Sequence, residues 1–408
     1  MVHAVRPHAA PTARGDRPAL CVINYNGARY LPTTLATLRE RRDRFGDAVL
    51  VDDASTDDSI AVARGVWPDL RIVGRRRNGG PGAARNTGAA RLKGPRVLFI
   101  DNDVVPESGC VAALEGALDA DPRAVIAMPR VVYLAAPDRI QFEGGDAHPS
   151  GLQTLRNADR PRTAAGTGPP RSVTSLVSAC FLIDRSRWGP HPLFDERLRI
   201  YLEDHELGVR ASLRGLRLLV VPDAICRHGD GTPGVSIRET GYATPTRIRN
   251  TMLNRWQVLL KLYQGRTLLL LAPSILLFEA YQLAGAAVLG WLPHWRGAVV
   301  ELVRMLPALR RRRREVRRLR RVPDAAVLRA GPHPFSRSLS RRRSVRILRG
   351  LLDVVGSGNW FLARRLLRAM RSVDRAVALR TPAVGPCPAE PRDGLPDRGR
   401  RRTDRTAV

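Results

Sequence analysis

Short apolar segments alternate with stretches of helical length from Ala19 onward, and this alternation restricts the fold more than any other feature. The apolar segments, expected as strands, are 19–23, 48–51, 70–73 and 96–100, and the intervening helices are expected at 31–42, 57–66 and 82–91. Because the connections are short, the pattern is typical of an α/β domain with a doubly wound, mostly parallel sheet. In such sheets ligands bind beyond the carboxyl ends of the strands, so the residues that follow each strand indicate function.

A polar cluster follows each of these four strands. The clusters are N-Y-N at 24–26, D-D-A-S-T-D at 52–57, N-G-G-P-G-A-A-R-N-T-G at 78–88 and D-N-D at 101–103. Carboxylates at strand ends can accept hydrogen bonds from a pyrimidine or a ribose, and a glycine-rich turn followed by Arg85 can bind a diphosphate. Asp101 and Asp103 stand two residues apart on an apolar strand and can share one face to hold Mg²⁺ or Mn²⁺.

Each cluster also has a plainer interpretation when taken alone. A D-x-D sequence is common in solvated turns, Asp52 and Asp53 can cap a helix, and the glycines can form only a turn. The occurrence of all four clusters at successive strand ends is much harder to explain by chance. Together they indicate a nucleotide site.

A second acidic region lies downstream, where F-D-E at 194–196 precedes Y-L-E-D-H-E-L-G-V-R at 201–210. We expect a helix to begin near Glu203. Carboxylates at a helix N-terminus are stabilised by the helix dipole, so a structural charge cluster is one interpretation. The other is a carboxylate that faces an acceptor hydroxyl. His228 follows a strand expected at 218–221, and a single histidine is more often structural than a ligand.

These motifs, in this order, resemble glycosyltransferase family 2 with a GT-A-type domain, most closely its rhamnosyl- and galactofuranosyltransferase-like branch. The resemblance covers about residues 18–255. It implies Asp204 as catalytic base, and Asp101, Asp103 and His228 as ligands of a divalent cation, Mg²⁺ or Mn²⁺. The residues expected to bind substrate are Tyr25, Asn26, Asp52, Asp53, Asn78, Arg85, Asn86, Asp101 and Glu203.

The resemblance also implies a reaction and its partners. We expect an inverting transfer of a sugar from a nucleoside-diphosphate sugar to a hydroxyl of a glycan or lipid-linked acceptor in bacterial surface polysaccharide synthesis. A nucleotidyltransferase on a related sheet and an inactive, arginine-rich membrane scaffold are the alternatives. The acidic helix about 100 residues beyond D-N-D argues against the first, and intact Asp101, Asp103 and Asp204 argue against the second.

Residues 268–292 raise the question of a membrane. They contain one charge, Glu279, and one helix breaker, Pro273, and are long enough to cross about 30 Å of hydrocarbon. A single crossing would place Arg310–Arg321 outside the cell if the α/β domain is inside, and would leave Glu279 near the bilayer centre. We therefore favour a re-entrant or interfacial helical hairpin, with a single span and a buried helical subdomain as alternatives.

The net charge of +30 is concentrated in the C-terminal half, where residues 236–408 carry +25 and nine of the twelve residues 310–321 are arginine. This excess suits an anionic lipid leaflet, and we expect the protein at the cytoplasmic face of the plasma membrane. No base-reading module accompanies the arginines, so no nucleic acid partner is expected.

The remaining segments complete the predicted organisation. Residues 1–17 have no apolar run, which argues against a secretory signal peptide, and five widely spaced cysteines indicate reduced, buried thiols. Residues 144–174 are expected to form a long loop over the sheet. We expect a disordered arm at 1–17, a nucleotide-sugar domain at 18–245, a basic helical region at 246–375 and a disordered tail at 376–408.

Overall fold

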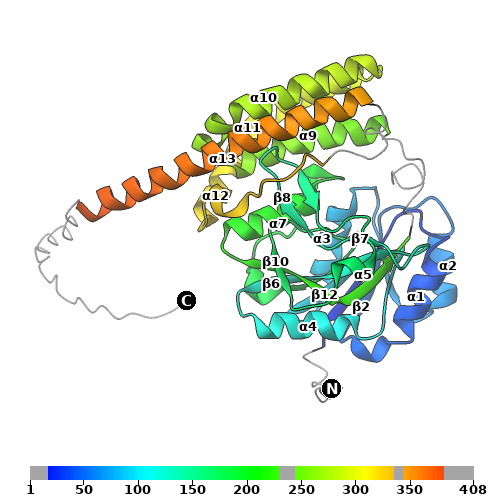
Figure 1. Ribbon diagram of the computed structural model, residues 1–408. Helices are drawn as coiled ribbons and strands as arrows, with labels where there is room; N and C mark the ends of the chain where they lie inside the picture. Colours follow the sequence, from blue (N-terminus) through cyan, green and yellow to red (C-terminus); the bar gives the residue numbers. More distant parts are fainter. Residues whose placement is uncertain (1–16, 230, 232–243, 335–342, 381–408) are drawn as a thin grey trace, which may run out of the picture. The chain divides into compact units, whose positions relative to one another are not determined.

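The computed structural model describes residues 17–229, 231, 244–334 and 343–380 (Figure 1). The predicted arm at 1–17 and tail at 376–408 lie almost entirely outside these residues. The chain divides into two compact units, Met1–Leu367 and Arg368–Val408. Everything below concerns the first unit.

A single large sheet organises the α/β domain. Within the described residues it has ten strands, with β10-β12-β6-β11-β4-β1-β2-β3 in order, β5 beside β12 and β7 beside β6. The strands are β1 (Ala19–Asn24), β2 (Ala48–Asp52), β3 (Arg71–Gly74), β4 (Arg96–Asp101), β5 (Val104–Pro106), β6 (Ala124–Tyr133), β7 (Ile140–Phe142), β10 (Arg171–Val173), β11 (Cys180–Asp184) and β12 (Arg217–His228). The four strands predicted first, β1 to β4, are all parallel to their neighbours within that set.

Helices cover both faces of this sheet, as the alternation predicted. They are α1 (Leu31–Arg39), α2 (Ser59–Val66), α3 (Pro81–Arg91), α4 (Cys110–Ala120), α5 (Arg162–Ala165), α6 (Arg185–Trp188) and α7 (Glu203–Leu213), with short 3₁₀ helices η1 (Arg42–Arg44) and η2 (Glu196–Leu198). Alternate residues of β1 enter two different cores: Leu20 packs with α1, α2 and α4, whereas Cys21 packs with α3 and α7. The predicted α/β class is therefore confirmed.

The segment 144–174 differs from the long loop expected. It contains β8 (Gly145–Ala147) and β9 (Gln153–Leu155), which pair in a separate antiparallel sheet, then α5 and the edge strand β10. Gly144 has a positive φ, which lets the chain turn before β8. The composition suggested a loop because these elements are only three or four residues long.

The described helices after Thr244 are α9 (Pro245–Leu262), α10 (Gly265–Val288), α11 (Leu292–Leu319), α12 (Asp324–Val327) and α13 (Arg343–Arg380). They enclose a third core that also includes Val209 and Leu213 of α7, so the helical region packs directly on the α/β domain. The hairpin expected over 268–292 is wrong. One helix runs through Pro273, and α10 is long and apolar enough to cross a membrane by length and composition.

The arginine cluster 310–321 is partly used inside the protein. Arg312 contacts Asp195, Arg313 donates to the carbonyl of Leu260, and Arg320 pairs with Asp324. The expectation that this whole cluster meets lipid is therefore wrong for these three arginines. On a helix of 3.6 residues per turn, a continuous run of one residue type faces all directions, including inward.

The cysteines agree with the prediction. Cys21, Cys110, Cys180 and Cys226 are free and buried, and Cys387 lies outside the described residues.

Candidate active site

The carboxyl ends of β1, β2 and β4 are joined by side-chain hydrogen bonds. Asn24 Nδ2 donates to Asp52 Oδ1 over 2.8 Å, and Asn102 Nδ2 donates to Asn24 Oδ1 over 2.7 Å. All three residues are buried. This chain of amides and a carboxylate fixes the three strand ends relative to one another, and the polar clusters predicted from the sequence meet there.

Asp52 and Asp53 are both bound by the protein's own groups. Asp52 accepts hydrogen bonds from the backbone and hydroxyl of Ser55, and Asp53 accepts from the N–H groups of Gly79 and Gly80. The N–H groups of Gly79 and Gly80 are thus bound to Asp53, and diphosphate binding by the glycine-rich turn stays a prediction. Burial raises the pKa of Asp53, and the two glycine N–H groups and Arg75 oppose that rise.

Gly80 is required where the glycine-rich turn enters α3. Its φ is +86°, and a Cβ there would lie 2.0 Å from the carbonyl oxygen of Arg199. A side chain at this position would therefore displace the backbone before α7. The turn is placed by Asp53 on one side and by Arg199 on the other.

Three further predicted substrate residues lie around the same strand ends. Tyr25 and Asn26 follow β1 and Asn78 follows β3, all partly exposed. Asn26 has a φ of +47°, and its Oδ1 accepts a hydrogen bond from the N–H of Thr56. The Asn26 side chain therefore holds the turn after β2.

The three predicted metal ligands come together. One ligand atom each of Asp101, Asp103 and His228 lies within 4.8 Å of the others. His228 Nε2 is 3.2 Å from Asp103 Oδ1, and its Nδ1 is 2.6 Å from Gln141 Oε1. A second partner of this kind fixes the ring of a metal-binding histidine, and two carboxylates with one imidazole suit a divalent cation such as Mn²⁺.

Pairing between strands explains how His228, more than 100 residues away, reaches the D-N-D motif. β5 follows the motif directly and pairs with the end of β12, with Val104 opposite His228. A cavity of about 260 Å³ lies beside Asp103 and is also lined by Tyr30 and Gly229. The cluster is therefore next to space that a ligand can enter.

Arg85 connects this cluster to the acidic helix. Its Nη2 donates to Asp101 over 2.5 Å and to the carbonyl of Ser178 over 2.7 Å. The guanidinium is buried against the rings of Phe181 and Phe194, and its Nε and Nη1 have no hydrogen-bond partner among the described residues. A buried cation with unused donors is a suitable group to meet an anion.

Glu203 and Asp204 begin α7 on the other side of Arg85. The N–H of Ser178 donates to Asp204 Oδ2 over 3.2 Å, and Glu203 is buried. Burial and the neighbouring Asp204 carboxylate raise the pKa of Glu203 to about 8, although Arg85 opposes this. Burial also raises the pKa of Asp204. Two carboxylates with raised pKa values beside one arginine are typical of a site that exchanges protons.

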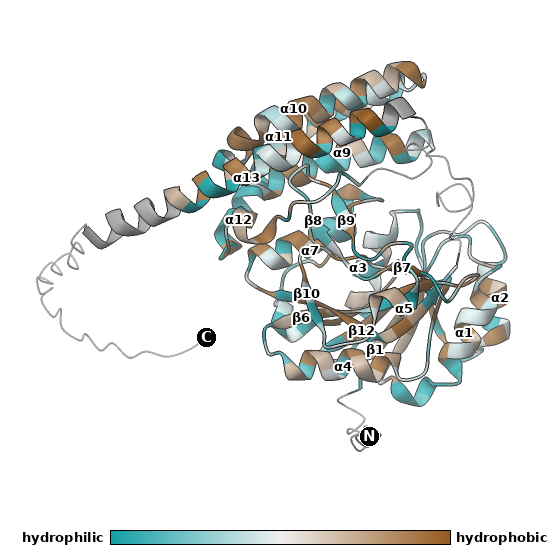
Figure 2. Cartoon of the chain, in the orientation of Figure 1, coloured by the Kyte–Doolittle hydropathy of each residue, from teal (hydrophilic) through white to brown (hydrophobic). Residues whose placement is uncertain are grey.

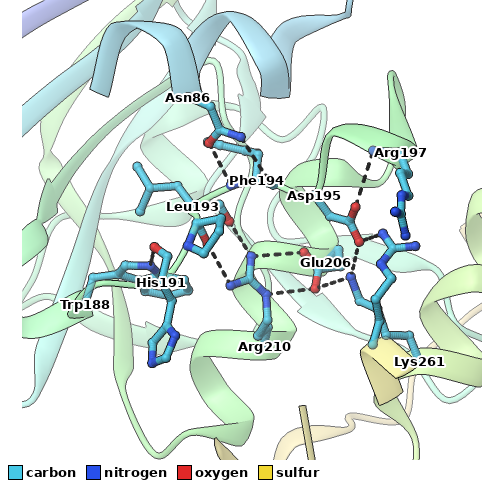
Figure 3. A network of polar contacts seen from close by, with 12 residues as sticks. Asn86, Trp188, His191, Leu193, Phe194, Asp195, Arg197, Glu206, Arg210 and Lys261 are labelled. Atoms are coloured by element: carbon cyan, nitrogen blue, oxygen red, sulfur yellow. Dashed lines mark hydrogen bonds and ion pairs between the residues drawn. The ribbon is translucent and has the colours of Figure 1, made fainter. Parts of the chain in front are cut away.

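The F-D-E segment links this pocket to the helical region (Figure 3). Asp195 accepts from Lys261 of α9 over 2.6 Å and contacts Arg312 of α11, while Lys261 also lies 2.8 Å from Glu206 of α7. Burial alone would raise the pKa of Glu206, but Arg210 and Lys261 outweigh it and lower the pKa to about 2. The result is a buried ionic network that runs from the α/β domain to α9 and α11.

Asn86 is part of the same arrangement. Its Nδ2 donates to the carbonyl of Phe194 over 2.9 Å, and its Oδ1 accepts from the N–H of that residue over 3.0 Å. Asn86 thereby fixes the segment that presses Phe194 against Arg85. A cavity of about 600 Å³ lies beside this network, between α3, α7, α9 and α11.

Several residues of this site were not found from the sequence. Ser178 holds both Asp204 and Arg85, Gln141 orients His228, and Arg75 binds Asp53 over 2.6 Å. Ser178 and Gln141 belong to no motif, and Arg75 is one of three successive arginines. Only the pairing of β6, β7 and β11 in the sheet brings the first two near the strand ends.

Known proteins resemble this chain over its α/β part. Residues 19–186 match the model of Glycosyl transferase family 2. A pre-mycofactocin glycosyltransferase of Mycobacterium tuberculosis is 30% identical over 233 residues, which are 56% of this chain and 45% of that protein. An N-acetylglucosaminyl-diphospho-decaprenol L-rhamnosyltransferase of the same organism is 28% identical over 229 residues, 50% of this chain and 74% of that protein.

The chain thus spans about half the length of the first of these relatives. Among solved structures, GalNAc-T7 with UDP, GalNAc and Mn²⁺ matches with a TM-score of 0.49 and 18% identity over 64% of this chain and 51% of that one. Staphylococcus aureus TarS with UDP matches with a TM-score of 0.46 and 17% identity over 86% and 91%. By its family match and the curated relatives, the α/β domain of this chain is similar to glycosyltransferase family 2 over residues 19–186.

Proposed function

We propose that this chain is a metal-dependent, inverting glycosyltransferase that uses a nucleoside-diphosphate sugar and a glycan or lipid-linked acceptor in bacterial surface polysaccharide synthesis. One observation carries the proposal: Arg85 and Ser178 connect the Asp101, Asp103 and His228 cluster to Asp204. A cation site and a carboxylate near one another are what a displacement at a sugar diphosphate requires. A scaffold without activity would not need both.

The chain's own residues perform three tasks in this proposal. A divalent cation held by Asp101, Asp103 and His228 would supply positive charge to the leaving diphosphate. Arg85 adds a guanidinium on the same side, and Asp204 accepts the proton of the acceptor hydroxyl as that oxygen attacks the anomeric carbon. The bond to the diphosphate breaks as the new bond forms, so a single displacement inverts the anomeric centre.

Glu203 supports Asp204 in this scheme. With its pKa raised to about 8, Glu203 holds a proton at neutral pH. Asp204 accepts hydrogen bonds from the N–H groups of Ser178 and His205, and these oppose the rise in its pKa that burial causes. This difference in hydrogen bonding favours Asp204 as the base.

The choice of acceptor and location follows from the relatives and from α10. The matching rhamnosyltransferase is named for a decaprenol-linked diphosphate, an acceptor embedded in a membrane. Its likeness to this chain, together with one helix apolar enough for a bilayer, supports a lipid-linked acceptor and attachment at the cytoplasmic face of the membrane.

A donor screen tests the proposal. Purified protein is incubated with a panel of nucleotide sugars and Mg²⁺ or Mn²⁺, and release of free nucleoside diphosphate is measured with and without membrane lipid extract. We expect one donor to be turned over, and EDTA to abolish the release. No release from any donor, or equal release in EDTA, would contradict the proposal.

A further inference from the structure

Two helices of the C-terminal region, α10 and α13, contain many apolar residues (Figure 2). The exposed apolar residues of α10 are Leu269, Leu276, Leu277, Leu283 and Val288, and those of α13 are Ile347, Leu348, Leu351, Val354, Val355, Phe361, Leu362 and Leu366. Soluble monomers rarely expose contiguous apolar surface on this scale. We call these residues the apolar face.

α13 has two apolar sides rather than one. Trp360, Ala363 and Leu367 are buried in the third core, whereas Leu351 and Val354 are 57% and 72% exposed. At 100° per residue, Leu351 and Val354 project away from the buried side. A helix that needs only to pack on its own domain requires a single apolar stripe, so the second stripe has another partner.

α10 is held against the protein along its inner side and beside α13. Glu279 pairs with Arg255 of α9, which is fully buried and also lies 4.5 Å from the ring centroid of Phe278. Ser274 Oγ donates to Asn359 Oδ1 over 2.7 Å, and Asn359 Nδ2 donates to the carbonyl of Leu270 over 3.0 Å. These contacts make α10 and α13 neighbours.

We propose that α10 and α13 together form an in-plane docking face for an anionic bilayer, without crossing it. A crossing α10 would have to leave α9 and carry Glu279 into hydrocarbon, which separates a buried ion pair and is costly. Lying in the interface, α10 keeps that pair and buries only its outer side. The inference rests on the membrane attachment in the proposed function and assigns it to particular residues.

The charges around the apolar face select this partner. Between Arg346 and Leu367, α13 has four arginines and a single acid, Asp353, which pairs with Arg349, while Arg346 and Arg365 are exposed. Long arginine side chains at the edge of an apolar stripe can reach anionic headgroups while their stems stay in the interface. Two copies of this chain would bring these like charges together, so a lipid surface is the better match.

Vesicle flotation of the full chain tests the inference. Vesicles of neutral phosphatidylcholine are compared with vesicles that also contain anionic phosphatidylglycerol. We expect the wild-type chain to float with both and more strongly with the anionic ones. The double variant Leu351→Asp with Val354→Asp should lower flotation at least tenfold, whereas the control Ile60→Asp, on exposed α2, should not change it.

Three outcomes, from flotation and two further measurements, would contradict the proposal. Unchanged flotation of the α13 double variant would mean that α10 attaches alone. Resistance of vesicle-bound wild type to alkaline carbonate extraction would indicate a spanning helix. A change from dimer to monomer in sedimentation, with flotation unchanged, would assign the face to a second copy.

Nucleoside-diphosphate release from soluble donor separates this inference from the proposed activity. Both substituted positions lie outside the candidate active site, so the α13 double variant should release nucleoside diphosphate at the wild-type rate. Absence of release in every form contradicts the proposed function and leaves the flotation result valid.

Discussion

Asp204 and Glu203 are adjacent in the sequence but differ in what surrounds their carboxylates. Asp204 accepts a backbone N–H from Ser178, whereas Glu203 Oε2 is buried without a partner among the described residues. The resemblance to glycosyltransferase family 2 implied a function for both. It could not predict which would be hydrogen-bonded, because Ser178 lies on a different segment that belongs to no motif.

Replacing Asp204 by Asn tests the assignment of the base. The change keeps the size and polarity of the side chain and removes the proton acceptor, so turnover should fall by about 10² or more while donor affinity stays near wild type. Turnover and donor KM with the identified donor measure both. Glu203→Gln is the matched comparison. If turnover falls about 10²-fold in Glu203→Gln and stays near wild type in Asp204→Asn, the base is Glu203.

At the scale of the element, the strands and helices of the parallel half were predicted closely and the connecting segments were not. The strand at 19–23 is observed at Ala19–Asn24, because continuous apolar runs and flanking turn residues mark a buried parallel strand. The short strands β8 and β9 pair with each other, whereas β10 pairs with the distant β12. The local composition of all three is that of a loop, so only their pairing in the structure reveals them.

The arginine cluster 310–321 shows that side-chain contacts of a helix also depend on residues outside it. The sequence predicted its charge but not the direction of each side chain. Arg312 faces inward because Asp195, from another part of the chain, lies within reach, and Arg320 pairs with Asp324 four residues further on.

The ionic network of α7 gives a prediction with a definite pH dependence. The folded-state pKa of Glu206 lies below its unfolded value, so its contribution to stability is present above about pH 4.5 and is lost as pH falls towards 2. Glu206→Gln should therefore lower the free energy of unfolding at pH 7 by about 3 kcal/mol, because Arg210 loses its carboxylate partner and buried Lys261 keeps only Asp195 as a paired carboxylate among the described residues. Urea denaturation measures this.

Measuring the free energy of unfolding at several pH values provides a control for this prediction. Wild type and Glu206→Gln should become more alike in stability between pH 4.5 and pH 3. A difference that stays constant down to pH 3 would mean that the carboxylate charge is not the source of the effect.

Gly208 places α7 against the segment that holds Asp204. A Cβ at this position would lie 2.2 Å from the backbone nitrogen of Leu176, so helix and strand connection must separate. Gly208→Ala should destabilise the fold by about 1–3 kcal/mol and lower turnover. Gly116→Ala in α4, where a Cβ meets nothing within 4 Å, should leave turnover unchanged and raise stability slightly. Equal melting temperatures for Gly208→Ala and Gly116→Ala would show that the contact between α7 and Leu176 can accept a methyl group.

At the scale of the whole molecule, the helical region is bound to the α/β domain rather than appended to it. Lys261 of α9 and Arg312 of α11 both contact Asp195, whose neighbour Phe194 packs on Arg85. The sequence predicted a boundary near residue 245 from a change in composition, and that boundary stays a prediction. It could not show the contacts across the boundary, because buried ion pairs have the same composition as exposed charges.

Membrane attachment should respond weakly to salt. At 1 M salt the Debye length is about 3 Å, so the attraction between arginines and anionic lipid is largely screened. Salt does not screen the insertion of the apolar face into the bilayer. The full chain should therefore stay with membranes after a 1 M salt wash, as measured by sedimentation and immunoblotting. Recovery in the soluble fraction at low salt would contradict membrane attachment altogether.

The central claim is that Asp101, Asp103 and His228 form a cation site for the donor diphosphate, with Asp204 acting separately on the acceptor. Calorimetric titration of the nucleoside diphosphate of the identified donor tests it most directly, in Mn²⁺ and in EDTA. We predict that wild type and Asp204→Asn bind equally well in Mn²⁺, and that Asp103→Ala and all EDTA samples bind at least tenfold more weakly. Wild-type affinity in EDTA, or in Asp103→Ala, would contradict the account.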